Sequence, residues 1–230
     1  SQSLLVNVQG PILLSTALYP YMTDQTTAGR ILHVSSGAAH GPPPIGWSIY
    51  GISKASFYQA FKAMDREFKH LGGSVRVGSF KPGVVDMDMQ GVIRMAPKET
   101  MPNVAAFHTM KEKVVTPPGP PQKAQPPPAG ALDSPDNVAF FAEWLLLGTS
   151  DDEFANADDP NEYDVRDKSL FHKWIDPENL PQENQWQAMT WEKIFLCILY
   201  YFLLTITWEK RMVFCILLLT NHHMRKTEKV

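Results

Sequence analysis

The sequence predicts an α/β fold built on a doubly wound parallel sheet. Two short runs of strand-like composition, residues 30–34 and 74–80, flank a helical pattern over residues 49–71. A strand, a long helix and a second strand joined by short connections form a βαβ unit, and the two strands of such a unit lie parallel in one sheet. The 230 residues suffice for one ordinary domain.

The first predicted element is a helix at the beginning of the chain. Apolar residues recur there at helical spacing, with a kink expected at Pro11: Leu4, Leu5, Val8, Ile12 and Leu13. The strand 30–34 follows. In the helix 49–71 a second apolar stripe has the spacing i, i+4, i+7, i+11: Phe57, Phe61, Met64 and Phe68. Gly72-Gly73 indicates the C-terminal cap of this helix.

Proline dominates the next region. We expect residues 97–135 to form an irregular insertion, because the runs 117–121 and 126–128 favour extended chain over helix or inner strand. A flexible insertion and a ligand for an SH3 or WW module are the two interpretations. An apolar helix is predicted over 138–147, and residues 151–174 have the composition of acidic loops. The predicted domain therefore covers residues 1–176.

Residues 177–230 form a tail of different character. The uncharged stretch 194–207 would be about 21 Å long as a helix, against a bilayer core of ~30 Å. Extending it to residue 220 would bury Glu209, Lys210 and Arg211. Three interpretations remain open: a poorly packed apolar extension, a weak interfacial membrane element within 194–220, and a helix that docks on the domain.

Composition narrows the class of protein. A formal net charge of −3 offers no basic face for nucleic acid. The two cysteines, Cys197 and Cys215, do not form a disulfide framework, and residues 1–30 lack a signal-peptide pattern. We therefore expect a cytoplasmic protein. The histidines and acidic clusters show no metal-ligand spacing, so no metal site is predicted.

A serine, a tyrosine and a lysine are spaced for acid–base chemistry. Tyr50 and Lys54 lie one turn apart on the same face of a predicted helix. A nearby ammonium favours phenolate, and a fall of ~3 units in the phenol pKa corresponds to roughly 4 kcal/mol. Such a tyrosine exchanges protons with a carbonyl or alcohol oxygen, and the Ser36 hydroxyl, after a strand end, would hold that oxygen. Tyr58 and Lys62 repeat the spacing, but we interpret them as helix packing and solvated surface.

Four motifs in the first 90 residues resemble the short-chain dehydrogenase/reductase family. They are Asn7-Val8-Gln9-Gly10-Pro11, the run 30–36 that ends in Ser35-Ser36, the run 46–54 that contains Tyr50 and Lys54, and the run 80–86 around Pro82-Gly83. Gly46-Trp47 and residues 86–90 are similar to the sepiapterin and benzil reductase branch. Residues 162–167 extend the resemblance to about Trp174. A Rossmann-like fold is what this resemblance implies.

The resemblance also implies roles for the matching residues. Asn7 would hold a water of the proton relay, Ser36 would orient the carbonyl, Tyr50 would be the general acid and base, and Lys54 would tune the tyrosine and bind the nicotinamide ribose. Further residues would line the nicotinamide pocket: Pro82, Gly83 and Val85. The implied activity is NAD(P)-dependent reduction of a small-molecule carbonyl, or its reverse. NADP follows from the branch, with NAD not excluded.

Three departures from the family pattern stand beside these matches. Ser36 lies fourteen residues before Tyr50, where thirteen is usual, and Met87 stands where a threonine is usual. The 230 residues hold no glycine-rich loop to receive a pyrophosphate at a helix N-terminus. We therefore expect an N-terminally truncated reductase, and an inactive form of this chain is part of that expectation. The alternative is a non-catalytic remnant that binds a partner through Phe57 and Phe61 or the proline stretch, or that associates with a membrane. The oligomeric state stays open, a homo-oligomer included.

Overall fold

The computed structural model describes residues 2–23, 29–114, 126, 129–155 and 162–175. The chain divides into two compact units, residues 1–193 and 194–230. All described residues belong to the first unit. The predicted tail 177–230, with its apolar stretch 194–220, lies outside the described residues.

A parallel sheet of three strands, β1 (Arg30–Val34), β2 (Arg76–Lys81) and β3 (Tyr163–Asp164), runs through the centre of the unit in the order β1-β2-β3. Ile31 pairs with Val77, and Phe80 pairs with Tyr163. Helix α3 (Ser48–His70) connects β1 to β2. The predicted βαβ unit is confirmed. The third strand lies in a segment that was expected to be a loop. A strand of two residues is too short to show the alternating pattern from which strands are predicted.

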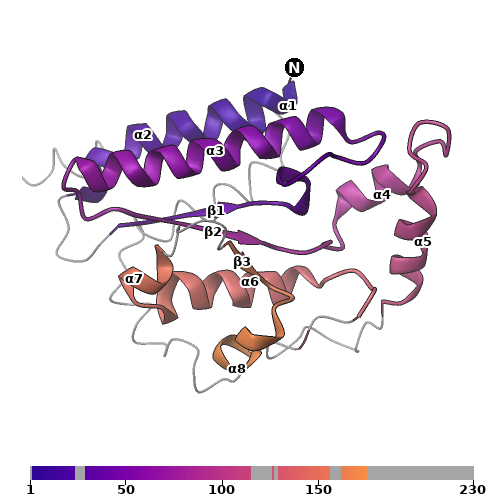
Figure 1. Ribbon diagram of the computed structural model, residues 1–230. Coiled ribbons are helices and arrows are strands. Elements are labelled where there is room, and N and C mark those ends of the chain that lie inside the picture. The colour runs from indigo at the N-terminus through magenta and orange to yellow at the C-terminus, as the bar shows by residue number, and fades with distance from the viewer. Residues whose placement is uncertain (1, 24–28, 115–125, 127–128, 156–161, 176–230) are drawn as a thin grey trace, which may run out of the picture. The chain divides into compact units, whose positions relative to one another are not determined.

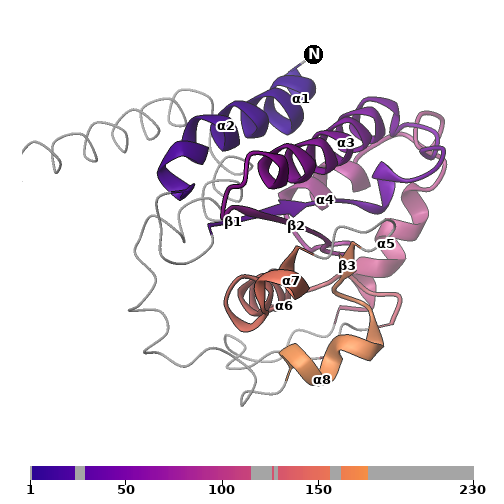
Figure 2. The same cartoon turned by 60° about the vertical axis from the view of Figure 1, so that its left-hand side comes forward.

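Helices cover both faces of this sheet (Figures 1 and 2). On one face lie α3 and the N-terminal helix, which consists of α1 (Gln2–Leu4), the π-helical turn η1 (Leu5–Gln9) and α2 (Gly10–Thr23). On the other lie α6 (Pro135–Glu143), the π-helical turn η3 (Trp144–Gly148) and α7 (Asp151–Phe154), with α8 (Phe171–Trp174) beyond α6. The layers are those of a doubly wound fold.

The predicted stripe of α3 is the face that packs on the sheet. Phe57, Phe61, Met64 and Phe68 are all buried, and the Phe61 ring stacks on His33 of β1 at 5.3 Å between centroids. The helix ends at His70, followed by Gly72 at φ +69°, a left-handed conformation that glycine adopts without a steric cost. Both the helix and its cap follow the sequence prediction.

A second aromatic cluster fills the opposite face. The fully buried Phe141 of α6 lies 5.6 Å from Phe80 of β2, 5.5 Å from Trp144 and 5.3 Å from Trp174 between ring centroids. Trp174 is itself fully buried. The last described helix is thereby attached to the core through one large side chain.

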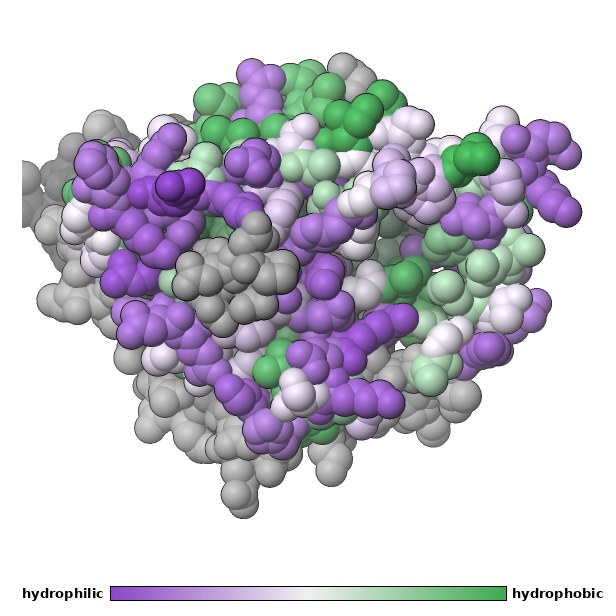
Figure 3. Space-filling view, viewed as in Figure 1, coloured by the Kyte–Doolittle hydropathy of each residue, from purple (hydrophilic) through white to green (hydrophobic). Residues whose placement is uncertain are grey.

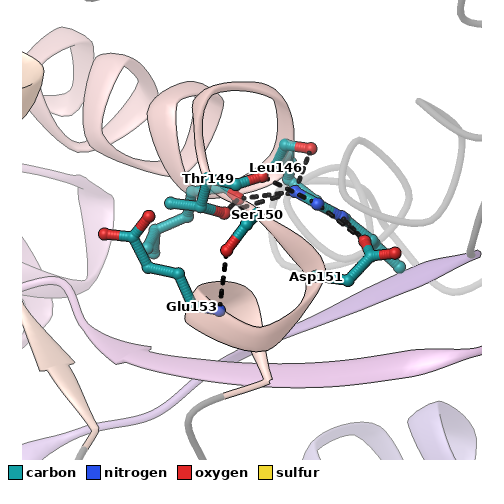
Figure 4. A network of polar contacts seen from close by, with 7 residues as sticks. Leu146, Thr149, Ser150, Asp151 and Glu153 are labelled. Atoms are coloured by element: carbon teal, nitrogen blue, oxygen red, sulfur yellow. Dashed lines mark hydrogen bonds and ion pairs between the residues drawn. The ribbon is translucent and has the colours of Figure 1, made fainter.

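Arg30, the first residue of β1, joins the sheet to the helices beneath it. Its guanidinium donates to the carbonyl oxygens of Leu146 at 3.0 Å and Thr149 at 2.8 Å, pairs with Asp151 at 2.8 Å, and lies 4.9 Å from the centre of the Phe154 ring. Figure 4 shows the residues that supply these acceptors, Leu146, Thr149 and Asp151. It also shows the Ser150 hydroxyl, which accepts a hydrogen bond from the Glu153 backbone amide. Unpaired carbonyls at a helix end are thus satisfied by a cation.

The expectation of an irregular insertion over 97–135 is wrong for residues 104–112, which are helical. Helices α4 (Asp88–Arg94) and α5 (Val104–Glu112) lie off the end of the sheet where β2 finishes. Val104 and Phe107 are buried, and Phe107 stacks on Trp47 at 5.6 Å. The proline runs lie later in the chain, mostly outside the described residues. A prediction based on the average composition of the whole region therefore missed the helix at its start. Short 3₁₀ turns complete the elements: η2 (Gly37–Ala39) and η4 (Lys168–Leu170).

Apolar side chains gather on the surface at the top of Figure 3, over α1 to α3. Exposed members of these helices include Leu5, Leu13, Ile49 and Ile52. Within the described ranges, none of the helices has both the length and the apolar character needed to cross a membrane.

Candidate active site

The carboxyl ends of β1 and β2 lie side by side because the strands are parallel. Ser35 and Ser36 follow β1, and Pro82 and Gly83 follow β2. Ser36 begins η2, where its Oγ accepts a hydrogen bond from the Ala38 backbone amide at 3.2 Å. This capping contact fixes the position of the serine hydroxyl at the edge of the sheet.

Tyr50 reaches the same edge from the first turn of α3. Its phenol lies near the Ser36 side chain, which lowers the phenol pKa, and its ring packs edge-on against Trp47 at 5.5 Å between centroids. Fourteen residues and a proline-rich loop separate the two hydroxyls in sequence. The fold nevertheless brings the two side chains close together.

Lys54 lies one turn further along α3 and is 6% exposed. Its Nζ donates to the Val34 carbonyl at 3.1 Å and lies 5.9 Å from the centre of the Tyr50 ring. Burial lowers the pKa of Lys54 to about 8, and the negative charge of Glu162 opposes this shift. The ammonium is therefore held at the last residue of β1, next to the ring of Tyr50.

The Tyr50 phenol differs electrostatically from the sequence-based expectation. Burial raises the pKa of Tyr50 above its ordinary value, and the Ser36 side chain opposes the rise. A fall had been expected from the neighbouring ammonium. The difference arises because desolvation disfavours the phenolate. In this structure the Tyr50 phenol is therefore protonated at neutral pH.

Asn7 contacts the same helix from the N-terminal segment. Its Nδ2 donates to Ser53 Oγ at 3.0 Å, and Ser53 Oγ donates to the Tyr50 carbonyl at 2.8 Å. Asn7 stands in the π-helical turn η1, four residues before Pro11, which has no N–H to donate to the Asn7 carbonyl. The expected kink at Pro11 thus takes the form of a π turn, a feature frequent at functional sites.

The turn Pro82–Val85, hereafter the Pro-Gly turn, is held by a residue that sequence reasoning did not find. Asp133 forms a parallel bridge with Val85 and is fully buried. Its carboxylate pairs with Arg166, Nη2 to Oδ2, at 2.7 Å. Nothing in the sequence marks Asp133. Arg166 stands inside the 162–167 motif, so only one member of the pair carried a signal.

A polar network behind Lys54 was also missed. Ser79 Oγ donates to Glu162 Oε1 at 2.6 Å and lies 2.8 Å from His33 Nδ1, while Glu162 Oε2 lies 2.5 Å from His40 Nε2. Burial, followed by the charges of Lys54 and His40, lowers the pKa of His33 well below its ordinary value. His33 is therefore neutral at neutral pH, and Glu162 is the acidic group next to the buried ammonium.

The second Tyr-x-x-x-Lys pair has different surroundings. The Tyr58 ring packs edge-on against His40 at 4.7 Å, and Lys62 Nζ lies 5.3 Å from its centre. The tyrosine whose pKa the Ser36 side chain lowers is Tyr50. Among the residues with a described structure, no group of three or more histidine, cysteine or acidic side chains is arranged to hold a metal ion.

Residues 1–98 match the family model described as short chain dehydrogenase. The benzil reductase ((S)-benzoin forming) of Bacillus cereus is 30% identical over 141 residues, 61% of this chain and 50% of that protein. The benzil reductase IRC24 of Saccharomyces cerevisiae is 38% identical over 148 residues, 64% of this chain and 50% of the relative. The chain thus spans about half the length of these curated relatives.

A solved structure, that of the KRED1-Pglu enzyme, is 28% identical with a TM-score of 0.49, covering 64% of this chain and 52% of that chain. The family model covers the strand ends and helix that carry Ser36, Tyr50, Lys54 and the Pro-Gly turn. Across residues 1–98 the chain is similar to the short-chain dehydrogenase family.

Proposed function

We propose that this chain carries the catalytic centre of an NADP-linked carbonyl reductase. The proximity of the Ser36 and Tyr50 side chains at the end of β1 and the start of α3 supports the proposal most directly, because a reacting carbonyl oxygen needs two such groups at one point. Lys54, buried one turn away, adds a positive charge. The family match supplies the class of reaction.

In the proposed reaction Ser36 orients the carbonyl oxygen of the substrate by donating a hydrogen bond. NADPH supplies the hydride that the carbonyl carbon accepts. The resulting alkoxide oxygen takes the proton from Tyr50 Oη, which leaves a phenolate beside Ser36 and Lys54. Each proton and electron pair is accounted for: the substrate gains one hydride and one proton and leaves as an alcohol.

The residues present fit the nicotinamide end of such a cofactor. The Lys54 ammonium is a donor of the kind that ribose hydroxyls accept, and the Pro-Gly turn follows the neighbouring strand at the same edge of the sheet. In open parallel sheets ligands bind at this edge. Asn7 belongs to the proposed centre through Ser53 and the Tyr50 carbonyl. Pro82, Gly83 and Val85 would line the pocket.

The raised pKa of Tyr50 keeps its phenol protonated at neutral pH. A protonated phenol can donate to an alkoxide, whereas alcohol oxidation would require the phenolate as base. The resting phenol is therefore in the protonation state that carbonyl reduction needs. Because two relatives are benzil reductases, an aromatic diketone such as benzil is the proposed substrate class, with Trp47 and Phe107 as the aromatic surface next to Tyr50.

The test compares the two tyrosines of α3. We expect the purified chain to reduce benzil with millimolar NADPH. Tyr50→Phe should lose a factor of ~10²–10⁴ in rate, because it removes the proton donor and little else. Tyr58→Phe is the matched control on the same helix and should retain turnover. The measurement is chiral chromatography of the benzoin formed, together with the loss of NADPH absorbance.

Equal activity in the two variants would refute the role of Tyr50. A folded wild-type chain that forms no alcohol from benzil or simpler diketones would contradict the proposed activity. That result would favour the non-catalytic, partner-binding alternative.

A further inference from the structure

The Pro-Gly turn adopts a backbone conformation that requires glycine. Gly83 has φ +74°, in the left-handed region. A Cβ atom at this position would lie 2.0 Å from Asp133 Oδ2. Glycine at this position therefore allows both the left-handed backbone of the turn and the close approach of the Asp133 carboxylate.

Asp133 uses its backbone and its side chain to hold this turn. Its amide donates to the Val84 carbonyl at 2.8 Å, and its carbonyl accepts from the Asp86 amide at 2.9 Å. Its Oδ2 accepts from the Val84 amide at 2.9 Å. One fully buried residue thus forms two hydrogen bonds with Val84 of the Pro-Gly turn, 49 residues earlier in the chain, and a third with Asp86 just after the turn.

Arg166 fixes the carboxylate from the other side. Its Nε donates to Asp133 Oδ2 at 2.9 Å, its Nη2 lies 2.7 Å from the same oxygen, and Nη2 also donates to the Ala131 carbonyl at 2.9 Å. Arg166 follows β3 in the chain, and its backbone amide donates to Oδ1 of Asp164, the last residue of that strand, at 2.9 Å. The planar guanidinium suits this double contact better than an ammonium would.

The Asp133 carboxylate of this pair is fully buried, whereas the Arg166 side chain is 35% exposed. Removing a carboxylate from water costs free energy that its partner repays only in part. Consistent with this cost, burial raises the pKa of Asp133, while Arg166 and the Val84 amide oppose the rise. A contact that adds little net stability and yet fixes a turn beside Ser36 and Tyr50 points to a positional role.

We infer that Asp133 and Arg166 are a positioning pair that fixes the Pro-Gly turn and, through it, the wall against which the nicotinamide ring would bind. The inference rests on the proposed function for the identity of that ring. Neither residue needs to touch the reacting atoms. The pair acts through the Val84 amide and through the space left open by Gly83.

The test uses two variants with two independent readouts. Asp133→Asn removes the charge but keeps an oxygen for the Val84 amide. Arg166→Lys keeps the charge but removes the planar double contact. Hydrogen exchange should accelerate at the Val84 and Asp86 amides by roughly tenfold or more, with the helix α3 amides unchanged. In the reductase assay the KM for NADPH should rise by a similar factor, while the KM for benzil stays within about twofold.

Asp65→Asn is the matched control. Asp65 is also a buried carboxylate, paired with Lys69 at 2.8 Å, but it lies on α3. Its loss should leave exchange at Val84 and the KM for NADPH unchanged. Unaltered exchange at Val84 in both test variants, or acceleration spread over the whole domain, would overturn the inference. Failure of the proposed function has a different signature: no turnover in the wild type, with exchange at Val84 still deciding whether the pair holds the turn.

Discussion

At the scale of single residues, the chemistry of the site depends on burial. Tyr50 and Lys54 lie one turn apart on α3, and burial favours the neutral form of each: it raises the pKa of the phenol and lowers the pKa of Lys54 to about 8. A charged lysine in this place costs stability. Active sites commonly retain such costs for function.

Lys54→Met tests that cost. Below pH 8 Lys54 is charged in both folded and unfolded chains, so the folded state alone bears the desolvation penalty, about 3 kcal/mol for a shift from 10.5 to about 8. Between pH 8 and about 10.5 only the unfolded chain binds the proton, so wild-type stability should rise with pH. The variant should therefore have a higher free energy of unfolding than the wild type at pH 7, reduced by the loss of the hydrogen bond to the Val34 carbonyl. The difference between variant and wild type should shrink from pH 8 to about pH 10.5.

Urea unfolding at several pH values measures this difference. Lys69→Met provides the control, since Lys69 is half exposed and pairs with Asp65, so its removal should not raise stability. A Lys54→Met variant that is less stable at pH 7 than at pH 10, relative to the wild type, would reverse the expected sign and contradict the burial argument.

At the scale of elements, strand ends and helix ends are joined by few, specific side chains. Arg30 begins β1 and binds the carbonyls that end η3. Arg76 occupies the facing register position on β2, where its Nη1 has one long contact, 3.4 Å to the Gly73 carbonyl. The two arginines therefore occupy paired positions in the sheet, but the Arg30 guanidinium has many polar partners and the Arg76 guanidinium has one long contact.

Arg30→Ala should lower the free energy of unfolding by about 3 kcal/mol, because it leaves Asp151 and several carbonyl oxygens without their cation. Arg76→Ala should cost less than about 1 kcal/mol. Chemical denaturation followed by circular dichroism measures both. Comparable losses in the two variants would show that strand position, rather than the guanidinium network, determines the effect.

The elements also show what the sequence could predict. The βαβ unit, the buried stripe of α3 and the glycine cap follow from local periodicity and composition, and all three are confirmed. Helix α5 was missed because nearby prolines dominated the composition. Asp133 was missed for another reason: its partners are 33 and 49 residues away, and tertiary contacts of this kind leave no local pattern. The proximity of Ser36 and Tyr50 could be predicted because Ser36 follows the end of a strand and Tyr50 lies at the start of the next helix.

At the scale of the whole molecule, the proposed centre accounts for only one end of a dinucleotide. Lys54 and the Pro-Gly turn suit a nicotinamide riboside, and the 230 residues contain no glycine-rich phosphate loop. We therefore expect weak binding of NADPH by this polypeptide, with no saturation at micromolar concentration. Reduced nicotinamide mononucleotide, which lacks the adenosine half, should bind about as well.

Fluorescence titration with the two compounds tests this expectation. Lys54→Met should weaken both to a similar degree, because the ribose next to nicotinamide is common to them. A dissociation constant for NADPH that is roughly a hundredfold or more below that of the mononucleotide would show that another segment of this chain holds the adenosine half.

The most direct test of the reductase centre is hydride transfer itself. The chain is incubated with benzil and with NADPH deuterated at the transferred position, and the benzoin is analysed by mass spectrometry and chiral chromatography. The account predicts one deuterium at the carbinol carbon, a single predominant enantiomer, and loss of this product in Tyr50→Phe but not in Tyr58→Phe. Benzoin without deuterium, or deuterated benzoin formed equally well by Tyr50→Phe, would contradict it.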